Sequence, residues 1–397
     1  MNTKYYLIIS CVFPPEPVVS SRLSSDLYKS LKENSKEVRV LHPKPTRPNG
    51  FDFCDTLTVS KDEIVADSYT CPQSSLVGRI KESISFGRYC ARYIKAHHNE
   101  IALIYANTWP MGSQYHIVKA AKKYGIPVAM HIQDVYPESL TNKMPVWMGG
   151  LLRTFVLPMD KYILRNSDKV IAISEKMKDY LCTTRGIDAS RCSVVINWQD
   201  ETEFLEYQKN AIPESNEKFT FMYMGNIGPV AGVDLLIDAF KAAQLNGARL
   251  VIAGSGSMKE ALREKAKNNQ NIEFWDVPNG KVPEIQSKAD VMMLPIKKGA
   301  ASSSIPSKLP AYMFSAKPII GCVDADSDTA EAIKNADCGW VIEPENPEKL
   351  AETMKVVVAL DKVYLEEKAS NALQYGLTHF SKKENLSKLV SIVEEVL

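Results

Sequence analysis

Short apolar runs alternate along the chain with longer stretches in which apolar residues recur every three or four positions. In the first half, this pattern predicts the strands Tyr5–Cys11, Glu37–Leu41, Ile101–Ala106, Val128–Ile132 and Lys169–Ile173, and the helices Ser20–Lys32, Leu76–His97, Tyr115–Tyr124, Leu151–Arg165 and Glu175–Thr183. Such alternation is typical of parallel strands joined by right-handed crossovers. The predicted fold class is therefore α/β.

The pattern is interrupted by a polar stretch, Glu201–Glu217, which reads as a linker. After it, the alternation predicts the strands Phe219–Met224, Ala248–Ala253, Ile272–Phe274, Val291–Leu294 and Pro318–Cys322, and the helices Val233–Ala243, Met258–Lys267, Ser307–Phe314 and Lys382–Leu397. We expect two Rossmann-like, doubly wound domains with a cleft between them. The predicted boundaries are 1–205 for the first domain, 206–217 for the linker, 218–375 for the second domain, and 376–397 for a C-terminal helix that crosses back to the first.

Composition narrows the class of protein. The 397 residues are 45% hydrophobic and 24% charged, with a formal net charge of +1. A general nucleic-acid-binding protein would carry a large basic excess, so we expect no nucleic-acid partner. The eight cysteines show no C-x-x-C or zinc spacing, and no apolar run is long enough to cross a bilayer. We expect a cytoplasmic protein with reduced cysteines.

Glycines follow two strands of the second half, at the strand ends where open α/β sheets bind ligands. Gly225, Asn226 and Gly228 end one strand, and Gly254 ends the next. Glycines let backbone N–H groups approach a phosphate, although the spacing is not that of a dinucleotide fingerprint. A tight strand-to-helix turn explains the segment from Gly225 to Gly228 equally well, and a plain cap and turn is the favoured interpretation at Gly254.

A hydroxyl-rich segment leads into the predicted helix Ser307–Phe314. Ser304 and Ser307 precede Lys308 in its first turn. A cation there opposes the positive end of the helix dipole, and a diphosphate would remove that conflict by accepting from free N–H groups and pairing with the ammonium. The alternative is a solvated lysine after a loop.

Polar residues also follow two strands of the first half. His131, Asp134 and Glu138 place an imidazole and two carboxylates after one strand, and Pro15 and Glu16 follow another. A lone histidine is more often structural. A histidine accompanied by carboxylates at a strand end modestly favours a functional site. No third ligand at sensible spacing accompanies His131 and Asp134, so we predict no metal there.

In this order, these residues resemble a bacterial glycosyltransferase of family 4, with the GT-B fold, from the capsule and O-antigen branch that includes N-acetylfucosamine-transferase-like proteins. The resemblance covers nearly the whole chain. It is carried by Phe13-Pro14-Pro15-Glu16, Gln133-Asp134-Val135-Tyr136-Pro137-Glu138-Ser139, Ser167-Asp168-Lys169-Val170-Ile171-Ala172-Ile173-Ser174-Glu175, Ile196-Asn197-Trp198-Gln199-Asp200, Gly225-Asn226-Ile227-Gly228, Pro306-Ser307-Lys308-Leu309, Tyr312-Met313 and Lys317-Pro318-Ile319-Ile320.

The resemblance implies a retaining transferase that uses a nucleotide-sugar donor, with UDP and an N-acetylated amino sugar as the expected pair. The second domain would hold the diphosphate with amides near Gly228 and with Ser307 and Lys308, and Val277 would seat the nucleobase. His131 would face the donor sugar, with Asp134 and Glu138 beside it. Retaining transfer mainly requires a stabilised leaving diphosphate and an oriented acceptor hydroxyl. We expect no metal and no cofactor.

The chain departs from the wider family at positions that matter. The usual pair of glutamates would fall at Ser303 and Ala311, and Asp328 or Glu331 could hold the ribose instead. The usual Arg and Lys after the Gly-rich strand would fall near Asn226 and Ala231. Lys308 is left as the main cation that the motifs place in the site.

The resemblance also implies an acceptor that is linked to polyprenyl diphosphate, bound by the first domain with Pro15 and Glu16 on its rim. Two segments suit peripheral membrane contact, the basic stretch Leu76–His98 and the apolar, Trp-containing stretch Val146–Leu157. A solvated basic helix beside a core helix explains them equally well. Two other functions stay open: a catalytically silent scaffold subunit, suggested by the missing glutamates, and a sugar-nucleotide epimerase.

Overall fold

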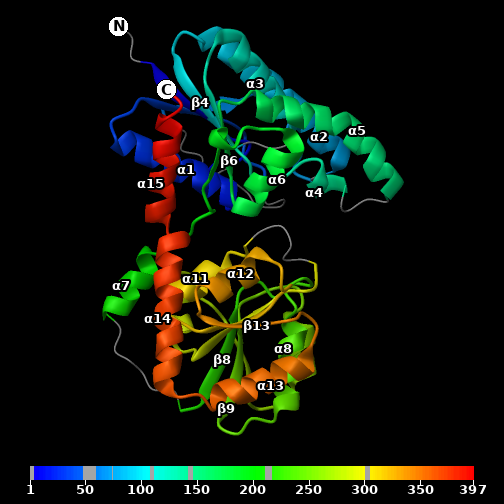
Figure 1. The fold of residues 1–397 in the computed structure, drawn as a ribbon, viewed down its shortest axis with the longest axis vertical. Coiled ribbons are helices and arrows are strands. Elements are labelled where there is room, and N and C mark those ends of the chain that lie inside the picture. The colour runs from blue at the N-terminus through cyan, green and yellow to red at the C-terminus, as the bar shows by residue number, and fades with distance from the viewer. Residues whose placement is uncertain are drawn as a thin grey trace. The chain divides into compact units, whose positions relative to one another are not determined.

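The computed structural model of the chain describes residues 4–47, 60–73, 75–107, 111–141, 146–210, 217–299 and 305–397. The chain divides into two compact units. Unit 1 comprises Met1–Asn197 and Asn385–Leu397, and unit 2 comprises Trp198–Glu384. Each unit contains one parallel sheet with helices packed against it (Figure 1).

Unit 1 is built on a seven-stranded parallel sheet with the order β3-β2-β1-β4-β5-β6-β7. Its strands are β1 (Tyr5–Ile9), β2 (Val38–Pro43), β3 (Glu63–Ala66), β4 (Ile101–Ala106), β5 (Val128–His131), β6 (Lys169–Ala172) and β7 (Cys192–Val194). Its helices are α1 (Val19–Glu33), α2 (Leu76–His97), α3 (Met111–Tyr124), α4 (Glu138–Thr141), α5 (Val146–Arg165), α6 (Glu175–Arg185) and the 3-10 turn η1 (Ala189–Arg191).

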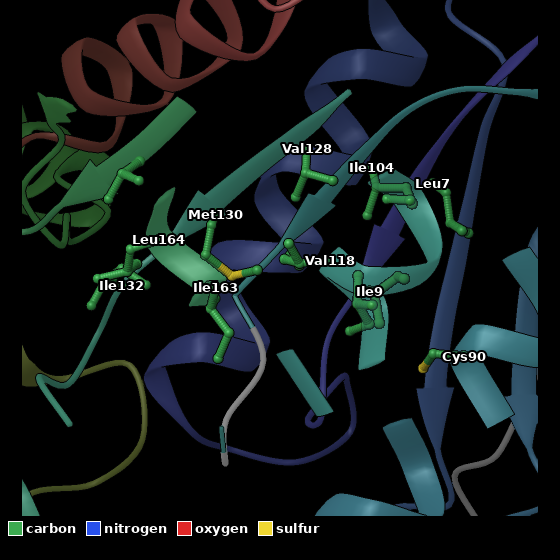
Figure 2. Packing of buried hydrophobic residues seen from close by; sticks show 14 of the residues in the cluster. Leu7, Ile9, Cys90, Ile104, Val118, Val128, Met130, Ile132, Ile163 and Leu164 are labelled. Carbon is green, nitrogen blue, oxygen red and sulfur yellow. The ribbon is translucent and has the colours of Figure 1, made fainter. Parts of the chain in front are cut away.

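The core of unit 1 lies where the central strands meet the helices. Leu7 and Ile9 of β1 and Ile104 of β4 pack with Val118 of α3 and Ile163 of α5, as Figure 2 shows. These side chains are fully buried, and each contributes about 1.5–3 kcal/mol through removal of apolar surface from water. Strands that are apolar on both faces are expected in a parallel sheet that helices cover on both sides.

Unit 2 is built on a six-stranded parallel sheet with the order β10-β9-β8-β11-β12-β13. Its strands are β8 (Phe219–Met224), β9 (Ala248–Ala253), β10 (Ile272–Trp275), β11 (Val291–Pro295), β12 (Ile319–Cys322) and β13 (Gly339–Ile342). Its helices are α7 (Thr202–Asn210), α8 (Val233–Ala243), α9 (Lys259–Ala266), α10 (Val282–Ser287), α11 (Lys308–Phe314), α12 (Asp328–Asn335), α13 (Pro347–Val358) and α14 (Lys362–His379). Helix α8 lies beside α13, and α11 lies beside α14 (Figure 1).

The boundary between the units differs from the one that the sequence suggests. Residues 206–210 of the predicted linker belong to helix α7, which is part of unit 2, and residues 211–216 lie outside the described residues. The Phe204 ring lies 5.8 Å from the Phe314 ring, and Gln208 donates to the Phe314 carbonyl at 2.6 Å. These contacts place the division at Asn197, ahead of α7, and not at residue 205.

The last helix, α15 (Lys382–Glu394), begins in unit 2 and belongs to unit 1 from Asn385 onward. Two ion pairs tie its end to unit 1. Lys36 lies 2.9 Å from Glu394, and Lys169 lies 3.8 Å from Glu395. Residues Asn385–Leu397 therefore pack as part of unit 1.

Candidate functional site

The sheet of unit 2 has a topological switch point between β8 and β11. From β8, the strand order runs through β9 to β10 on one side and through β11 to β13 on the other. Open α/β sheets bind ligands beyond the carboxyl ends of the strands at such a point. The pairing of β8 with β11 ends at Met222, two residues before β8 itself ends.

Beyond Met222, β8 no longer pairs with β11, and Tyr312 of α11 hydrogen-bonds to the last residue of β8 instead. Its fully buried hydroxyl accepts a hydrogen bond from the Met224 N–H at 3.0 Å and donates one to the Met224 carbonyl at 2.8 Å. One side chain thus satisfies both backbone groups at the end of the strand. No motif predicts a role for Tyr312, although its spacing of four residues from Lys308 places both on one face of a helix.

Lys308 reaches across the glycine that follows β8. Its ammonium lies 5.3 Å from the centroid of the Tyr223 ring, and a methyl group on Gly225 would collide with its Cε. Gly225 has a φ of +149°, which L side chains rarely adopt. Both the conformation and the close approach of Lys308 therefore require glycine here.

The electrostatic setting of Lys308 favours an anionic ligand. The side chain is half-buried, and burial lowers the pKa of Lys308. No carboxylate of the described residues offsets this loss of hydration. An ammonium without a counter-charge at a ligand-binding strand end is suited to pair with phosphate oxygens.

Gly254 lets the loops after β8 and β9 touch. Its φ is +127°, and a methyl group there would overlap the Gly225 carbonyl. Next to it, the Ile227 N–H donates to the Ser255 carbonyl at 2.8 Å. The structure gives Gly254 a packing role, and its predicted contact with the donor stays a prediction.

The remaining donor-side residues lie beside the same strand ends. Asn226 is exposed, and its carbonyl accepts from the Tyr223 hydroxyl at 2.6 Å, while Gly228 is half-buried. Lys259 donates to the Gly254 carbonyl at 2.8 Å and pairs with Asp276 at 2.7 Å, so it joins the loops after β9 and β10. Val277 directly follows Asp276 and is half-buried.

Helix α11 is shorter than the dipole argument requires. It begins at Lys308 and has seven residues, and the exposed Ser307 before it makes no side-chain capping bond. A helix of this length supplies little dipole, so the case for phosphate rests on the Lys308 ammonium. Ser304 lies outside the described residues.

In unit 1, His131 ends β5 and is 1% exposed. Its Nδ1 lies 2.8 Å from the hydroxyl of Tyr105, and its buried Nε2 has no hydrogen-bond partner among the described residues. Burial lowers the pKa of His131 to about 3, so the imidazole is neutral at physiological pH.

The two carboxylates after His131 have different surroundings. Asp134 is exposed. Glu138 begins α4 and pairs at 2.5 Å with Arg185, which is fully buried and also pairs with Asp160 at 2.6 Å and donates to the Tyr136 carbonyl. Arg185 thereby fixes the loop after β5 to α5 and α6. No sequence motif marks a buried ion pair, so Arg185 was not predicted.

Glu16 also holds backbone. Its buried carboxylate accepts hydrogen bonds from the N–H groups of Phe13, Thr46 and Arg47 at 3.3, 2.8 and 2.8 Å. Pro15 beside it is half-buried. Glu16 therefore braces its loop against the segment after β2, and its predicted place near the acceptor stays a prediction.

The described residues contain no group of three or more His, Cys, Asp or Glu side chains placed to hold a metal ion. Within the same residues, no helix combines the length and the apolar character that a transmembrane span requires.

Two family models match consecutive parts of the chain. The model "Glycosyltransferase Family 4" matches residues 21–202, and the model "Glycosyl transferases group 1" matches residues 218–359.

Two curated relatives align with the chain at low identity. WbjE of Pseudomonas aeruginosa, whose assigned role is that of a glycosyltransferase, is 21% identical over 274 residues, which is 67% of this chain and 68% of WbjE. WcaI of Escherichia coli K12, whose assigned role is that of a colanic acid biosynthesis glycosyl transferase, is 23% identical over 255 residues. That alignment covers 61% of this chain and 62% of WcaI, so the chain spans less than two thirds of WcaI.

Among solved structures, Anabaena HepE in complex with UDP matches with a TM-score of 0.64 and 14% identity, over 98% of this chain and 100% of that chain. At this identity the likeness concerns the fold. Between them, the two family models cover most of the chain and show that it belongs to the group 1, family 4 glycosyltransferases, and its fold is GT-B.

Proposed function

We propose that this protein is a retaining glycosyltransferase that moves a sugar from UDP to a polyprenyl-diphosphate-linked saccharide in bacterial surface polysaccharide synthesis. The single observation that carries the proposal is the half-buried Lys308 ammonium over Gly225, at the switch point of unit 2 and without a carboxylate partner among the described residues. The donor sugar is an N-acetylated amino sugar, as in the branch that the motifs resemble.

In the proposed reaction, the bond between the sugar and the diphosphate breaks, and the acceptor hydroxyl forms the new bond on the same face. Negative charge grows on the leaving diphosphate. Lys308 would stabilise that charge, assisted by backbone N–H groups around Gly225 and Gly228, so no metal ion is needed. UDP bound in HepE, a protein of similar fold, supports the choice of nucleotide.

Residues of unit 1 complete the proposal. His131 would bind the donor sugar, and Asp134 is the exposed carboxylate nearest to it in sequence. Glu138 would act by holding their loop, because its carboxylate is engaged by Arg185 and by the Tyr180 hydroxyl at 2.7 Å. Orientation of the acceptor hydroxyl, which the enzyme must supply, depends on such fixed loops.

A lipid-linked acceptor requires access to a membrane surface, and α2 offers a suitable face. Val77, Ile80 and Ile84 are exposed in its first half at helical spacing, and Arg88, Arg92 and Lys95 are exposed in its second half. The sole acid of α2, Glu82, is buried and pairs with Arg47 and Arg79 at 2.6 and 2.8 Å. An exposed apolar and basic face without acids suits the surface of an anionic leaflet.

The proposed function is tested by incubating the full chain with a panel of nucleotide sugars and a polyprenyl-diphosphate-linked acceptor. We expect transfer from one UDP-sugar with retention at the anomeric carbon, and loss of most transfer in Lys308→Ala with the fold intact. Transfer at the wild-type rate by Lys308→Ala, or product of inverted configuration, would contradict the mechanism.

One observation favours a second candidate, a catalytically silent scaffold. Ala311 stands in α11 where the family usually has a glutamate, and it is buried and cannot bind ribose hydroxyls through a carboxylate. Turnover of a radiolabelled sugar nucleotide by the purified protein alone would exclude this candidate.

A further inference from the structure

Tyr105 and His131 form a buried polar pair inside the sheet of unit 1. Tyr105 in β4 is paired with Ala129 in β5, so His131 is its diagonal neighbour two residues further along β5. Residues in this relation lie on the same face of the sheet. Both side chains are 1% exposed, and the Tyr105 hydroxyl lies 2.8 Å from His131 Nδ1.

The protons of this pair can be assigned by counting partners. A neutral imidazole has one N–H and one acceptor nitrogen, and a tyrosine hydroxyl has one hydrogen to donate. If Nδ1 carried the proton, it would donate to Tyr105, and the buried hydroxyl would then need an acceptor. Among the described residues, His131 Nδ1 is the one partner recorded for that hydroxyl. This arrangement would leave both the hydroxyl hydrogen and Nε2 without partners.

The other arrangement leaves a single group unpaired. If Tyr105 donates to Nδ1, the hydroxyl is satisfied and the imidazole proton resides on Nε2. Each buried polar group without a partner costs about 1–3 kcal/mol, so the second arrangement is favoured. Nε2 is buried and has no partner among the described residues, which makes its N–H the one hydrogen bond that the pair still offers to a ligand.

We propose that Tyr105 is a positioning residue that holds His131 as the neutral Nε2–H tautomer, so that His131 donates a hydrogen bond to a hydroxyl oxygen of the sugar and takes no part in proton transfer. The identity of the ligand rests on the proposed function, whereas the tautomer does not. The neutral Nε2–H group of His131 is suited to an uncharged sugar hydroxyl. Lys308 would pair with the negatively charged diphosphate.

The tautomer is measured directly by NMR of the full chain labelled with 15N-histidine, which reports which ring nitrogen carries the proton. The signals of His131 among the six histidines are identified by their loss in His131→Gln. We expect the proton on Nε2 throughout pH 5–8 in the wild type, and a loss of that preference in Tyr105→Phe. A proton on Nδ1, or an imidazolium at pH 6, would overturn the proposal, and the wild-type spectrum alone decides this.

Tyr5→Phe is the matched control, because Tyr5 is a buried tyrosine in the same sheet whose hydroxyl bonds to Tyr93 at 3.0 Å. It should leave the His131 signals unchanged. A change equal to that in Tyr105→Phe would show that the tautomer follows general packing and would overturn the role of Tyr105.

A kinetic cycle tests the link to the donor. We expect Tyr105→Phe to lower kcat/KM for the donor about tenfold, the loss expected for one hydrogen bond, and to have no further effect in the His131→Gln background. An equal loss in both backgrounds would overturn action through His131. If the NMR result holds but no UDP-sugar is used, the proposed function fails and the tautomer assignment stands.

Discussion

Gly225 has no side chain, and this leaves room for Lys308 to lie close to the backbone there. We predict that Gly225→Ala displaces Lys308 and weakens UDP binding about tenfold, because a methyl group there collides with Cε. Isothermal titration calorimetry measures the affinity.

Gly280→Ala controls for backbone strain in this comparison. Gly280 also has a positive φ, +73°, but a methyl group there meets no atom within 4 Å. It should lower stability slightly and leave UDP affinity unchanged. Equal affinities in wild type and Gly225→Ala would remove the case for Lys308 at this position.

His131 makes a prediction about pH. Its pKa is about 3 in the folded chain, well below its ordinary value, so only the unfolded chain takes up this proton as the pH falls below about 6.5. Its contribution to stability is therefore full above pH 6.5 and falls by about 1.4 kcal/mol per pH unit on acidification toward pH 3.

Melting temperatures of wild type and His131→Gln between pH 7.5 and 4.5 test this sign. The variant should lose less stability on acidification. Other buried groups, such as Asp160, whose pKa burial raises to about 6, are present in both proteins and cancel in the comparison. The same acid sensitivity in both proteins would contradict a buried, neutral His131.

Helix α11 contributes two residues to the switch point of unit 2, one structural and one proposed to bind ligand. Tyr312 secures the end of β8, and Lys308, one turn earlier, lies over Gly225. We predict that Tyr312→Phe costs about 1–3 kcal/mol for each backbone group of Met224 left unpaired, and that amide hydrogen exchange rises at residues 222–226.

Tyr207→Phe serves as the control in unit 2, because its hydroxyl bonds to the Ser287 hydroxyl at 3.0 Å away from β8. It should leave exchange at residues 222–226 unchanged. Unchanged exchange in Tyr312→Phe as well would mean that the strand end does not depend on α11.

The exposed face of α2 carries a prediction about lipid. Ile80, which is 54% exposed, should enter the headgroup region, and Ile80→Asp should weaken binding to vesicles that contain an anionic phospholipid about tenfold. Sedimentation with vesicles measures this binding, and vesicles of neutral lipid should bind less.

Val363 of α14 is 70% exposed and provides the matched substitution, Val363→Asp. It should bind anionic vesicles as the wild type does. Wild-type binding by Ile80→Asp would refute α2 as the lipid-facing element, and an equal loss in both variants would assign the effect to added negative charge alone.

Sequence periodicity predicts the central elements well and the edges poorly. Helix α2, Leu76–His97, and strand β8, Phe219–Met224, have the predicted bounds. The short strands β3, β7 and β13 were not predicted, because three or four residues carry too little periodic signal. Helix α7 was mistaken for a linker because its polar surface hides the buried Phe204.

The roles predicted for the site residues stay predictions, and the structure adds the residues that support them. The motifs identified Gly225, Lys308 and His131, since each is an unusual residue at a strand end or helix start. Tyr105 and Arg185 could not be found, because their roles depend on neighbours far away in sequence. Glu16 and Glu138 were predicted as site residues, and their carboxylates are occupied by backbone and by Arg185.

At the scale of the whole molecule, the proposed function requires unit 2 to bind a nucleotide diphosphate without a metal ion. Calorimetric titration of the full chain with UDP in EDTA measures this, with Lys349→Gln, an exposed lysine paired with Glu352, as the control. We predict saturable binding by the wild type and the control, and a loss of about tenfold or more in Lys308→Gln. No binding by the wild type, or equal affinity in Lys308→Gln, would contradict the proposed role of Lys308 in holding the diphosphate.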